Sequence, residues 1–217
     1  MDTDQPNAVT IWAGSIELEG ALEMPENANG VVLFAHGSGS SRHSPRNNYV
    51  AGRLREQGLG TLLLDLLTPE EDRDPQNRFN IGLLAERLAA AREWLLDEPA
   101  THNHHLGLFG ASTGAAAALQ LAGRFGHEIA AVVSRGGRPD LAGETALGTV
   151  TAPTLLIVGG DDDVVITLNR EAFTRLHCEK ELVIVPGATH LFEEPGKLEQ
   201  VATLAANWFT RHCRTLI

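Results

Sequence analysis

The chain has 217 residues, of which 43% are hydrophobic and 21% charged, and its formal net charge is −11. Its length and composition predict one globular domain over 1–217 with a substantial core. The acidic balance argues against a nucleic-acid partner, no apolar run is long enough to span a membrane, and the polar N-terminus does not resemble a signal peptide. Cys178 and Cys213 match no metal or redox spacing and are expected to be free thiols in a reducing compartment, so we expect a cytoplasmic protein without a membrane partner.

The predicted elements alternate between strands and helices. Residues 9–23 alternate polar and apolar side chains around Gly14 and Ser15, which predicts a β-hairpin with one solvated face. Continuous apolar runs then predict buried strands at 31–35, 61–65, 105–109, 129–133, 154–158 and 182–186. Helices are expected at 44–58, 81–99, directly after Ser112, at 167–177 and at 198–209. The segments 66–78 and 134–151 are expected to be polar connections.

This alternation predicts an α/β fold: a mostly parallel sheet with right-handed crossovers, helices on both faces and an antiparallel hairpin at one edge. Active sites in such sheets lie beyond the carboxyl ends of the strands. That rule selects the loops after Ala35, Phe109, Val158 and Pro186, and each of them contains chemically useful residues.

The most informative loop is Gly110-Ala-Ser112-Thr-Gly114, which joins an apolar run to an alanine-rich helical segment. The Gly-x-Ser-x-Gly pattern in a strand–turn–helix context is typical of a serine nucleophile on a sharp turn, with the helix N-terminus beside it. The alternative is a glycine-rich turn whose serine is merely buried, so the rest of the chain has to decide.

A serine nucleophile needs a histidine base and an acid that orients the base. After Ser112, the predicted strand at 154–158 is followed by three aspartates, Asp161, Asp162 and Asp163, and the last predicted strand is followed by His190. The chain order is therefore serine, acid, histidine. The sequence alone leaves all three aspartates open. The remaining histidines, including the cluster at 102–105, are interpreted as surface or structural residues, and no metal site is predicted.

Two backbone N–H groups are expected to form an oxyanion hole: that of Thr113, after the nucleophile, and that of Ser38, in the glycine-containing loop that begins at His36. Arg135 and Arg138 could bind a substrate carboxylate. The alternative for both arginines is an ion pair with Asp140 or simple exposure to water.

Together these motifs make the chain resemble the serine α/β-hydrolases, and more closely the dienelactone-hydrolase-like group. The resemblance covers nearly the whole chain, through His36-Gly-Ser-Gly-Ser-Ser, Gly110-Ala-Ser-Thr-Gly, Ser134-Arg-Gly-Gly-Arg-Pro-Asp, Val158-Gly-Gly-Asp-Asp and Pro186-Gly-Ala-Thr-His-Leu-Phe. It implies an eight-stranded sheet with an antiparallel second strand, no large cap domain, and a triad of Ser112, Asp162 and His190. Dienelactone hydrolases proper use a cysteine nucleophile, and Ser112 stands in its place here.

These residues predict a carboxylic ester hydrolase that forms an acyl-enzyme and acts on small or short acyl substrates without a cofactor or metal. Lactone or thioester hydrolysis, or acyl transfer, would use the same triad, because pocket shape selects the substrate. A non-catalytic binding protein on the same fold is the rival of a different class. The sequence leaves the natural substrate and the choice between monomer and homodimer open.

Overall fold

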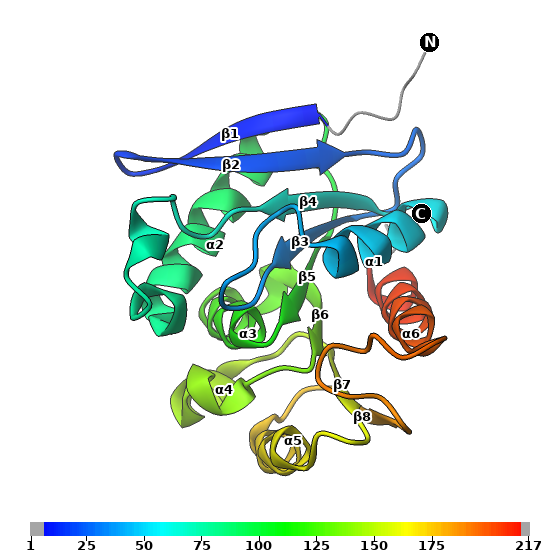
Figure 1. The fold of residues 1–217 in the computed structure, drawn as a ribbon. Coiled ribbons are helices and arrows are strands. Elements are labelled where there is room, and N and C mark those ends of the chain that lie inside the picture. The colour runs from blue at the N-terminus through cyan, green and yellow to red at the C-terminus, as the bar shows by residue number, and fades with distance from the viewer. Residues whose placement is uncertain (1–6, 214–217) are drawn as a thin grey trace.

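The computed structural model describes residues 7–213 and contains one eight-stranded sheet in the order β1-β2-β4-β3-β5-β6-β7-β8 (Figure 1). The strands are β1 (Asn7–Ala13), β2 (Ile16–Glu23), β3 (Val31–Ala35), β4 (Gly60–Leu64), β5 (Leu106–Ala111), β6 (Ile129–Arg135), β7 (Thr154–Gly159) and β8 (Lys180–Val185). β2 is antiparallel to β1 and β4, and every other neighbouring pair is parallel. The predicted fold class, including the edge hairpin and the antiparallel second strand, is confirmed.

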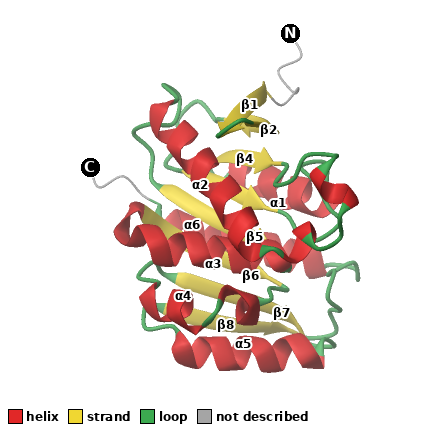
Figure 2. Ribbon diagram, turned by 90° about the vertical axis from the view of Figure 1, so that its left-hand side faces the viewer, coloured by secondary structure: helices red, strands yellow, loops and turns green. Residues whose placement is uncertain are grey.

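Helices cover both faces of the sheet. α1 (Pro45–Glu56) and α6 (Lys197–His212) lie on one face, and α2 (Ile81–Asp97), α3 (Thr113–Phe125), α4 (Glu144–Thr149) and α5 (Asp163–Arg175) lie on the other. Figure 2 shows the second group in front of the sheet. Ser44 caps α1 by accepting a hydrogen bond from the Asn47 N–H, and Pro45 occupies the first turn, as the sequence predicts.

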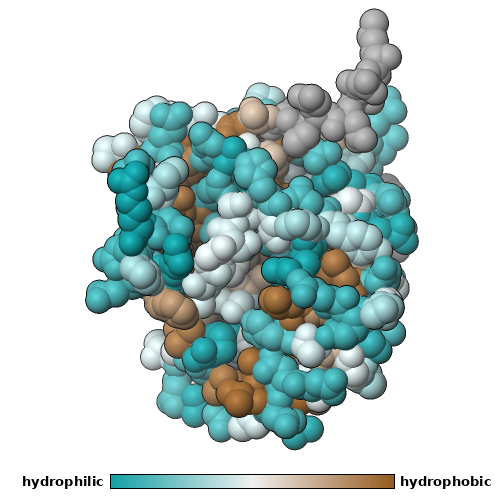
Figure 3. Space-filling model, in the orientation of Figure 1, coloured by the Kyte–Doolittle hydropathy of each residue, from teal (hydrophilic) through white to brown (hydrophobic). Residues whose placement is uncertain are grey.

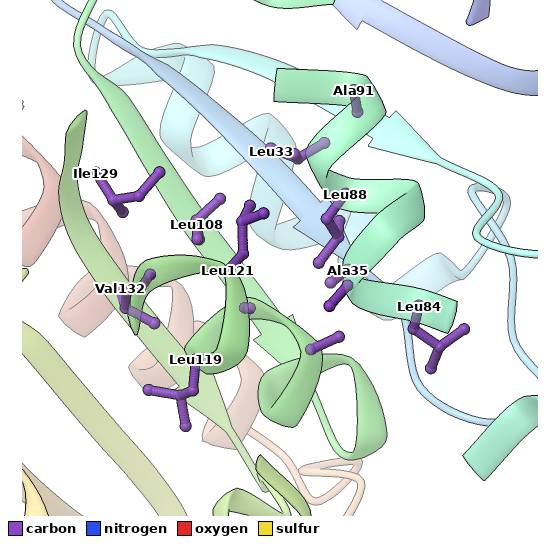
Figure 4. Packing of buried hydrophobic residues seen from close by; sticks show 14 of the residues in the cluster. Leu33, Ala35, Leu84, Leu88, Ala91, Leu108, Leu119, Leu121, Ile129 and Val132 are labelled. Carbon is purple, nitrogen blue, oxygen red and sulfur yellow. The ribbon is translucent and has the colours of Figure 1, made fainter. Parts of the chain in front are cut away.

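Because both faces are covered, every residue of the central strands β3, β4 and β5 is buried. Alternate residues of β3 enter the two cores: Leu33 packs toward α2 and α3, and Phe34 packs toward α1 and α6. Figure 4 shows side chains of α2, α3, β3, β5 and β6 meeting in the first of these cores. Four consecutive alanines, 115–118, are fully buried on α3, so this helix lies close to the sheet.

Several elements differ from the sequence-based predictions. α5 begins at Asp163, four residues before the predicted start, because Val165 and Ile166 pack into the core as helical residues rather than as part of the loop. β6 extends through Arg135, and the connection after it contains the unpredicted helix α4, anchored by the buried Leu147. The connection at 66–78 contains two short 3-10 turns, Glu71–Arg73 and Asn77–Phe79.

Candidate active site

Ser112 occupies the junction between β5 and α3 in a strained backbone conformation. Its φ is 51° and its ψ is −119°, a region that residues other than glycine rarely adopt. Three backbone hydrogen bonds hold the turn: the Ser112 N–H donates to the Arg135 carbonyl oxygen (3.2 Å), and the Ser112 carbonyl oxygen accepts from Ala115 (3.1 Å) and Arg138 (3.1 Å). The sharp strand–turn–helix geometry predicted for this serine is therefore present.

The flanking glycines allow this turn to form. A Cβ on Gly110 would lie within 3.0 Å of the Ala115 backbone, and one on Gly114 would lie within 3.0 Å of the Ala35 carbonyl oxygen. Neither contact can be relieved by moving the end of a flexible side chain, because both neighbours are backbone.

We expect Gly114→Ala to lower the free energy of unfolding by about 3 kcal/mol or more, because the extra methyl group would push α3 away from β3. Chemical denaturation with circular dichroism measures this change. Gly148→Ala is the matched control, since a Cβ at Gly148 meets nothing within 4 Å inside α4. The control should be neutral or stabilising by about 0.5–1 kcal/mol. Equal effects of the two substitutions would contradict the close-approach argument.

Asp162 and His190 are brought together from two different strand ends. The Asp162 Oδ2 atom lies 2.7 Å from the His190 Nδ1 atom, with the carboxylate side chain 16% exposed and the imidazole 36% exposed. Asp161 and Asp163 are exposed. Asp162 is also the N-cap residue of α5, but its side chain makes no capping hydrogen bond, so its carboxylate is directed to the imidazole instead.

The segment Arg135–Gly136 lies between the serine and the histidine. The carbonyl oxygen of Arg135 accepts a hydrogen bond from the Ser112 N–H. A Cβ on Gly136 would lie 3.4 Å from His190 Cε1 and 3.1 Å from the His190 carbonyl oxygen. Gly136 has a φ of +52°, which suits a glycine. Ser112, through its backbone N–H, and His190, through its ring and carbonyl oxygen, therefore contact the same two-residue segment.

The loop predicted to complete the oxyanion hole lies over the nucleophile. A Cβ on Gly37 would lie 3.1 Å from Ser112 Cβ. Ser38 and Thr113, whose N–H groups are the predicted donors, line one small cavity of about 10 Å³, close to the least volume that holds one water molecule. The Thr113 Oγ1 atom is buried and has no hydrogen-bond partner among the residues that the structure describes. Leu67, Asp72 and Arg78 supply the outer wall from the 66–78 connection.

His36, at the base of this loop, has a structural contact that the sequence did not reveal. Its Nε2 atom accepts a hydrogen bond from the Leu66 N–H (3.0 Å), and its Nδ1 atom lies 2.9 Å from the Gly37 carbonyl oxygen. Both bonds are satisfied only by the neutral ring with its proton on Nδ1. The loop is also tied to the end of β4 by Asp65, whose carboxylate accepts from the Arg42 N–H (2.6 Å) and from the Arg42 guanidinium.

Burial lowers the pKa of His36 below its ordinary value of 6.5, outweighing the hydrogen bond to Gly37, which raises it. The folded protein therefore binds this proton less readily than the unfolded chain. The stability that comes from keeping His36 neutral is present above pH 6.5 and is lost as the pH falls below it.

We expect the free energy of unfolding to fall less steeply between pH 7 and pH 5 in His36→Gln than in the wild type, by up to about 1.4 kcal/mol per pH unit. Denaturant titrations at several pH values measure the two slopes. His127→Gln, which changes an exposed histidine, should keep the wild-type slope. A His36→Gln slope equal to that of the wild type would show that His36 does not resist protonation in the fold.

The two arginines proposed from the sequence to contact substrate have protein partners. The Arg138 Nε and Nη2 atoms donate to the two carboxylate oxygens of Asp140 (2.9 and 2.8 Å), which is the alternative that the sequence left open. Arg135 is 5% exposed, and its Nη2 atom lies 3.4 Å from Asn47 Oδ1.

Within residues 7–213, no three histidine, cysteine, aspartate or glutamate side chains form a group that could hold a metal ion. No helix among these residues is long and apolar enough to cross a membrane.

Comparison with known proteins identifies the family. The model of the dienelactone hydrolase family matches residues 18–216. The chain belongs to the dienelactone hydrolase family. A crystal structure of a dienelactone hydrolase from Anabaena variabilis superposes with a TM-score of 0.93 and 54% sequence identity, covering 97% of this chain and 99% of that one. The esterase domain of a Rhodothermus marinus protein shares the fold with a TM-score of 0.77, at 22% identity over 96% of this chain and 99% of that one.

A longer relative of this chain occurs in Mycobacterium tuberculosis. It carries the name "Putative phosphoribosyl transferase" and is 57% identical over 204 residues, which are 94% of this chain and 46% of the relative. The chain therefore spans less than half the length of this relative. The family and the Anabaena variabilis structure support a hydrolase.

Proposed function

We propose that this hydrolase cleaves carboxylic esters of small or short-chain acids through an acyl-enzyme on Ser112. The observation that carries the proposal is the Asp162–His190 pair, at 2.7 Å, which contacts the same Arg135–Gly136 segment as a serine held on a strained turn between β5 and α3. A carboxylate on Nδ1 leaves the Nε2 atom of His190 free to accept a proton from the serine hydroxyl.

The proposed reaction has two halves. The Ser112 oxygen attacks the ester carbonyl carbon while His190 accepts the hydroxyl proton, and the N–H groups of Ser38 and Thr113 stabilise the oxyanion. The carbon–oxygen bond to the alcohol breaks as His190 returns the proton to the leaving oxygen. A water molecule then attacks the acyl-enzyme with His190 again as the base, releasing the acid and restoring Ser112.

A fluorophosphonate probe and a panel of p-nitrophenyl esters, lactones and thioesters at one enzyme concentration test this proposal. We expect one equivalent of phosphonate on Ser112 and turnover that is fastest on esters. If Ser112 is labelled but lactones or thioesters are turned over faster than esters, the substrate class would be lactones or thioesters, cleaved by the same triad. If the protein shows no labelling and no turnover, that result would favour a binding protein. The transferase name belongs to a relative more than twice as long, so the proposal is confined to the hydrolase site.

The connection after β6 indicates an open site. Between Arg135 and Thr154 it contains only a short 3-10 turn, Pro139–Ala142, and the six-residue helix α4, which is too little to form a cap domain. On the face shown in Figure 3, hydrophobic residues form separate small areas rather than one continuous surface for lipid.

We therefore expect kcat/KM for laurate esters not to exceed that for acetate and butyrate esters, since methylenes that stay in water contribute little binding energy. The rate should show no jump when the substrate exceeds its solubility. Comparison of soluble and emulsified esters of the same acid measures this. Faster turnover of long-chain triglyceride emulsions than of acetate would contradict the open, short-acyl site.

A further inference from the structure

Within residues 7–213, Arg135 is a buried cation with no carboxylate partner. Its side chain makes one hydrogen bond, to Asn47 Oδ1 at 3.4 Å, and its Nε atom is buried without a partner. Burial, with a smaller effect of Arg46, lowers the pKa of Arg135 to about 10. The other buried arginines in the described part of the chain, Arg87 and Arg92, have glutamate partners. A buried charge without an opposite charge destabilises a fold, so another requirement must account for this arginine.

The position of Arg135 suggests that requirement. It is the last residue of β6, its carbonyl oxygen accepts the Ser112 N–H, and the next residue, Gly136, packs against His190. The backbone at Arg135 therefore touches the turn that carries the serine and leads into the backbone that supports the histidine.

The Arg135 guanidinium also lies near the loop that carries His190. It lies 6.0 Å from the centre of the Phe192 ring, and Phe192 is fully buried with a φ of +57°. A positive φ is strained for a phenylalanine, so the surrounding contacts must hold this residue in place. The guanidinium of Arg135 thus lies between α1, through Asn47, and the strained residue two positions after His190. Above it, Arg46 of α1 pairs with Glu193 of the same loop (2.5 Å).

We propose that Arg135 is a positioning residue for the hydrolase reaction: it fixes the loop of His190 relative to the turn of Ser112 by joining β6, α1 and Phe192. This inference rests on the proposed function. Arg135 acts through Phe192 and Gly136 and does not contact the substrate, because its side chain is buried and directed to Asn47. A planar guanidinium can donate in its plane to Asn47 while presenting its face to an aromatic ring, which neither lysine nor methionine can do.

The test compares Arg135→Met and Arg135→Lys with Arg92→Met, a matched substitution of another buried arginine, which lies over the Phe125 ring and pairs with Glu128 outside the site. We expect Arg135→Met to lower kcat on a short ester by roughly 10- to 100-fold while KM changes less than about threefold, because a displaced base slows the chemical step more than binding. Arg135→Lys should recover part of the loss, and Arg92→Met should stay within about threefold of the wild type.

The pH dependence of kcat/KM separates positioning from a general loss of stability. The charged groups in the segments around His190 are Arg135, the Arg46–Glu193 pair, Glu194, which accepts from the Thr189 hydroxyl (2.5 Å), Lys197, and the three aspartates 161–163. Removing one positive charge makes protonation of the imidazole easier, so Arg135→Met should shift the acidic limb to higher pH. Arg92→Met should leave that limb in place.

Wild type and Ser112→Ala are assayed beside these variants with the same ester and phosphonate probe. A wild type that neither turns over the ester nor reacts with the probe would remove the proposed function. A reactive wild type with a folded Arg135→Met of unchanged kcat and pH profile would overturn the role of Arg135 alone. A rise in KM without a fall in kcat would also overturn it, since that result indicates contact with substrate. If Arg135→Met does not fold, the folded Arg135→Lys decides, with full activity contradicting the proposal.

Discussion

We expect Ser112→Ala to lower kcat on a short ester by about 10⁴- to 10⁶-fold. No other group in the site can replace the attacking oxygen, whereas loss of an orienting group leaves the nucleophile in place. The fold should be retained, since Ser112 makes only backbone hydrogen bonds in the turn and alanine meets the same backbone strain at a φ of 51°. Steady-state kinetics and stoichiometric phosphonate labelling measure the effect, with circular dichroism to establish folding.

Ser112→Gly is the matched control for the strain at this position. Glycine accepts positive φ at little cost, so this variant should be equally inactive yet about 1 kcal/mol more stable than Ser112→Ala. If the pure alanine variant keeps more than a few per cent of wild-type turnover, the nucleophile lies elsewhere.

Asp162→Asn should lower kcat by roughly 10⁴-fold, as loss of the orienting acid does in the best-studied triad. An amide on the Nδ1 side of His190 can hold the ring with its proton on the wrong nitrogen, so Nε2 no longer accepts the serine proton. The Asp162 Oδ2 atom is 2.7 Å from that nitrogen. We expect phosphonate labelling of Ser112 to slow in parallel with turnover.

The neighbouring aspartates provide controls within the same tripeptide. Asp161 and Asp163 are exposed, and Asp163 lies in the first turn of α5, where a carboxylate favours the helix dipole. Their asparagine variants should change kcat less than about tenfold, and Asp163→Asn should cost at most about 1 kcal/mol of stability. An inactive Asp161→Asn or Asp163→Asn beside an active Asp162→Asn would refute the assignment of the acid.

Much of the architecture follows from local sequence patterns. The continuous apolar runs predicted the positions of β3, β4 and β7 within one residue, and Ser44-Pro45 marked the start of α1. These signals are strong because both faces of each strand are buried and because proline is restricted to a few helix positions. α4 carries no comparable signal: it has six residues, and three of them are glycine or threonine.

The site was predictable where chemistry depends on residue type and strand order, and not where it depends on distant contacts. The turn is predicted by the pattern of Gly110, Ser112 and Gly114. The order of the loops along the chain predicts that Asp162 and His190 lie close together. The bond between His36 and Leu66 joins residues 30 positions apart, and the burial of Arg135 depends on Asn47 and Phe192 from two other elements. No spacing in the sequence encodes such contacts.

The division of the site among separate strand ends makes it a sensor of folding. Asp162 and His190 are 28 residues apart, and Ser112 lies two strands away from the β7 end, so no single supersecondary unit contains the reactive groups. Partly folded chains with complete helices and a misaligned β8 would give a native-like far-ultraviolet spectrum without a reactive serine. The fraction of molecules that capture a phosphonate is therefore a stricter measure of correct folding than helix content, and is suited to judging preparations and refolding yields.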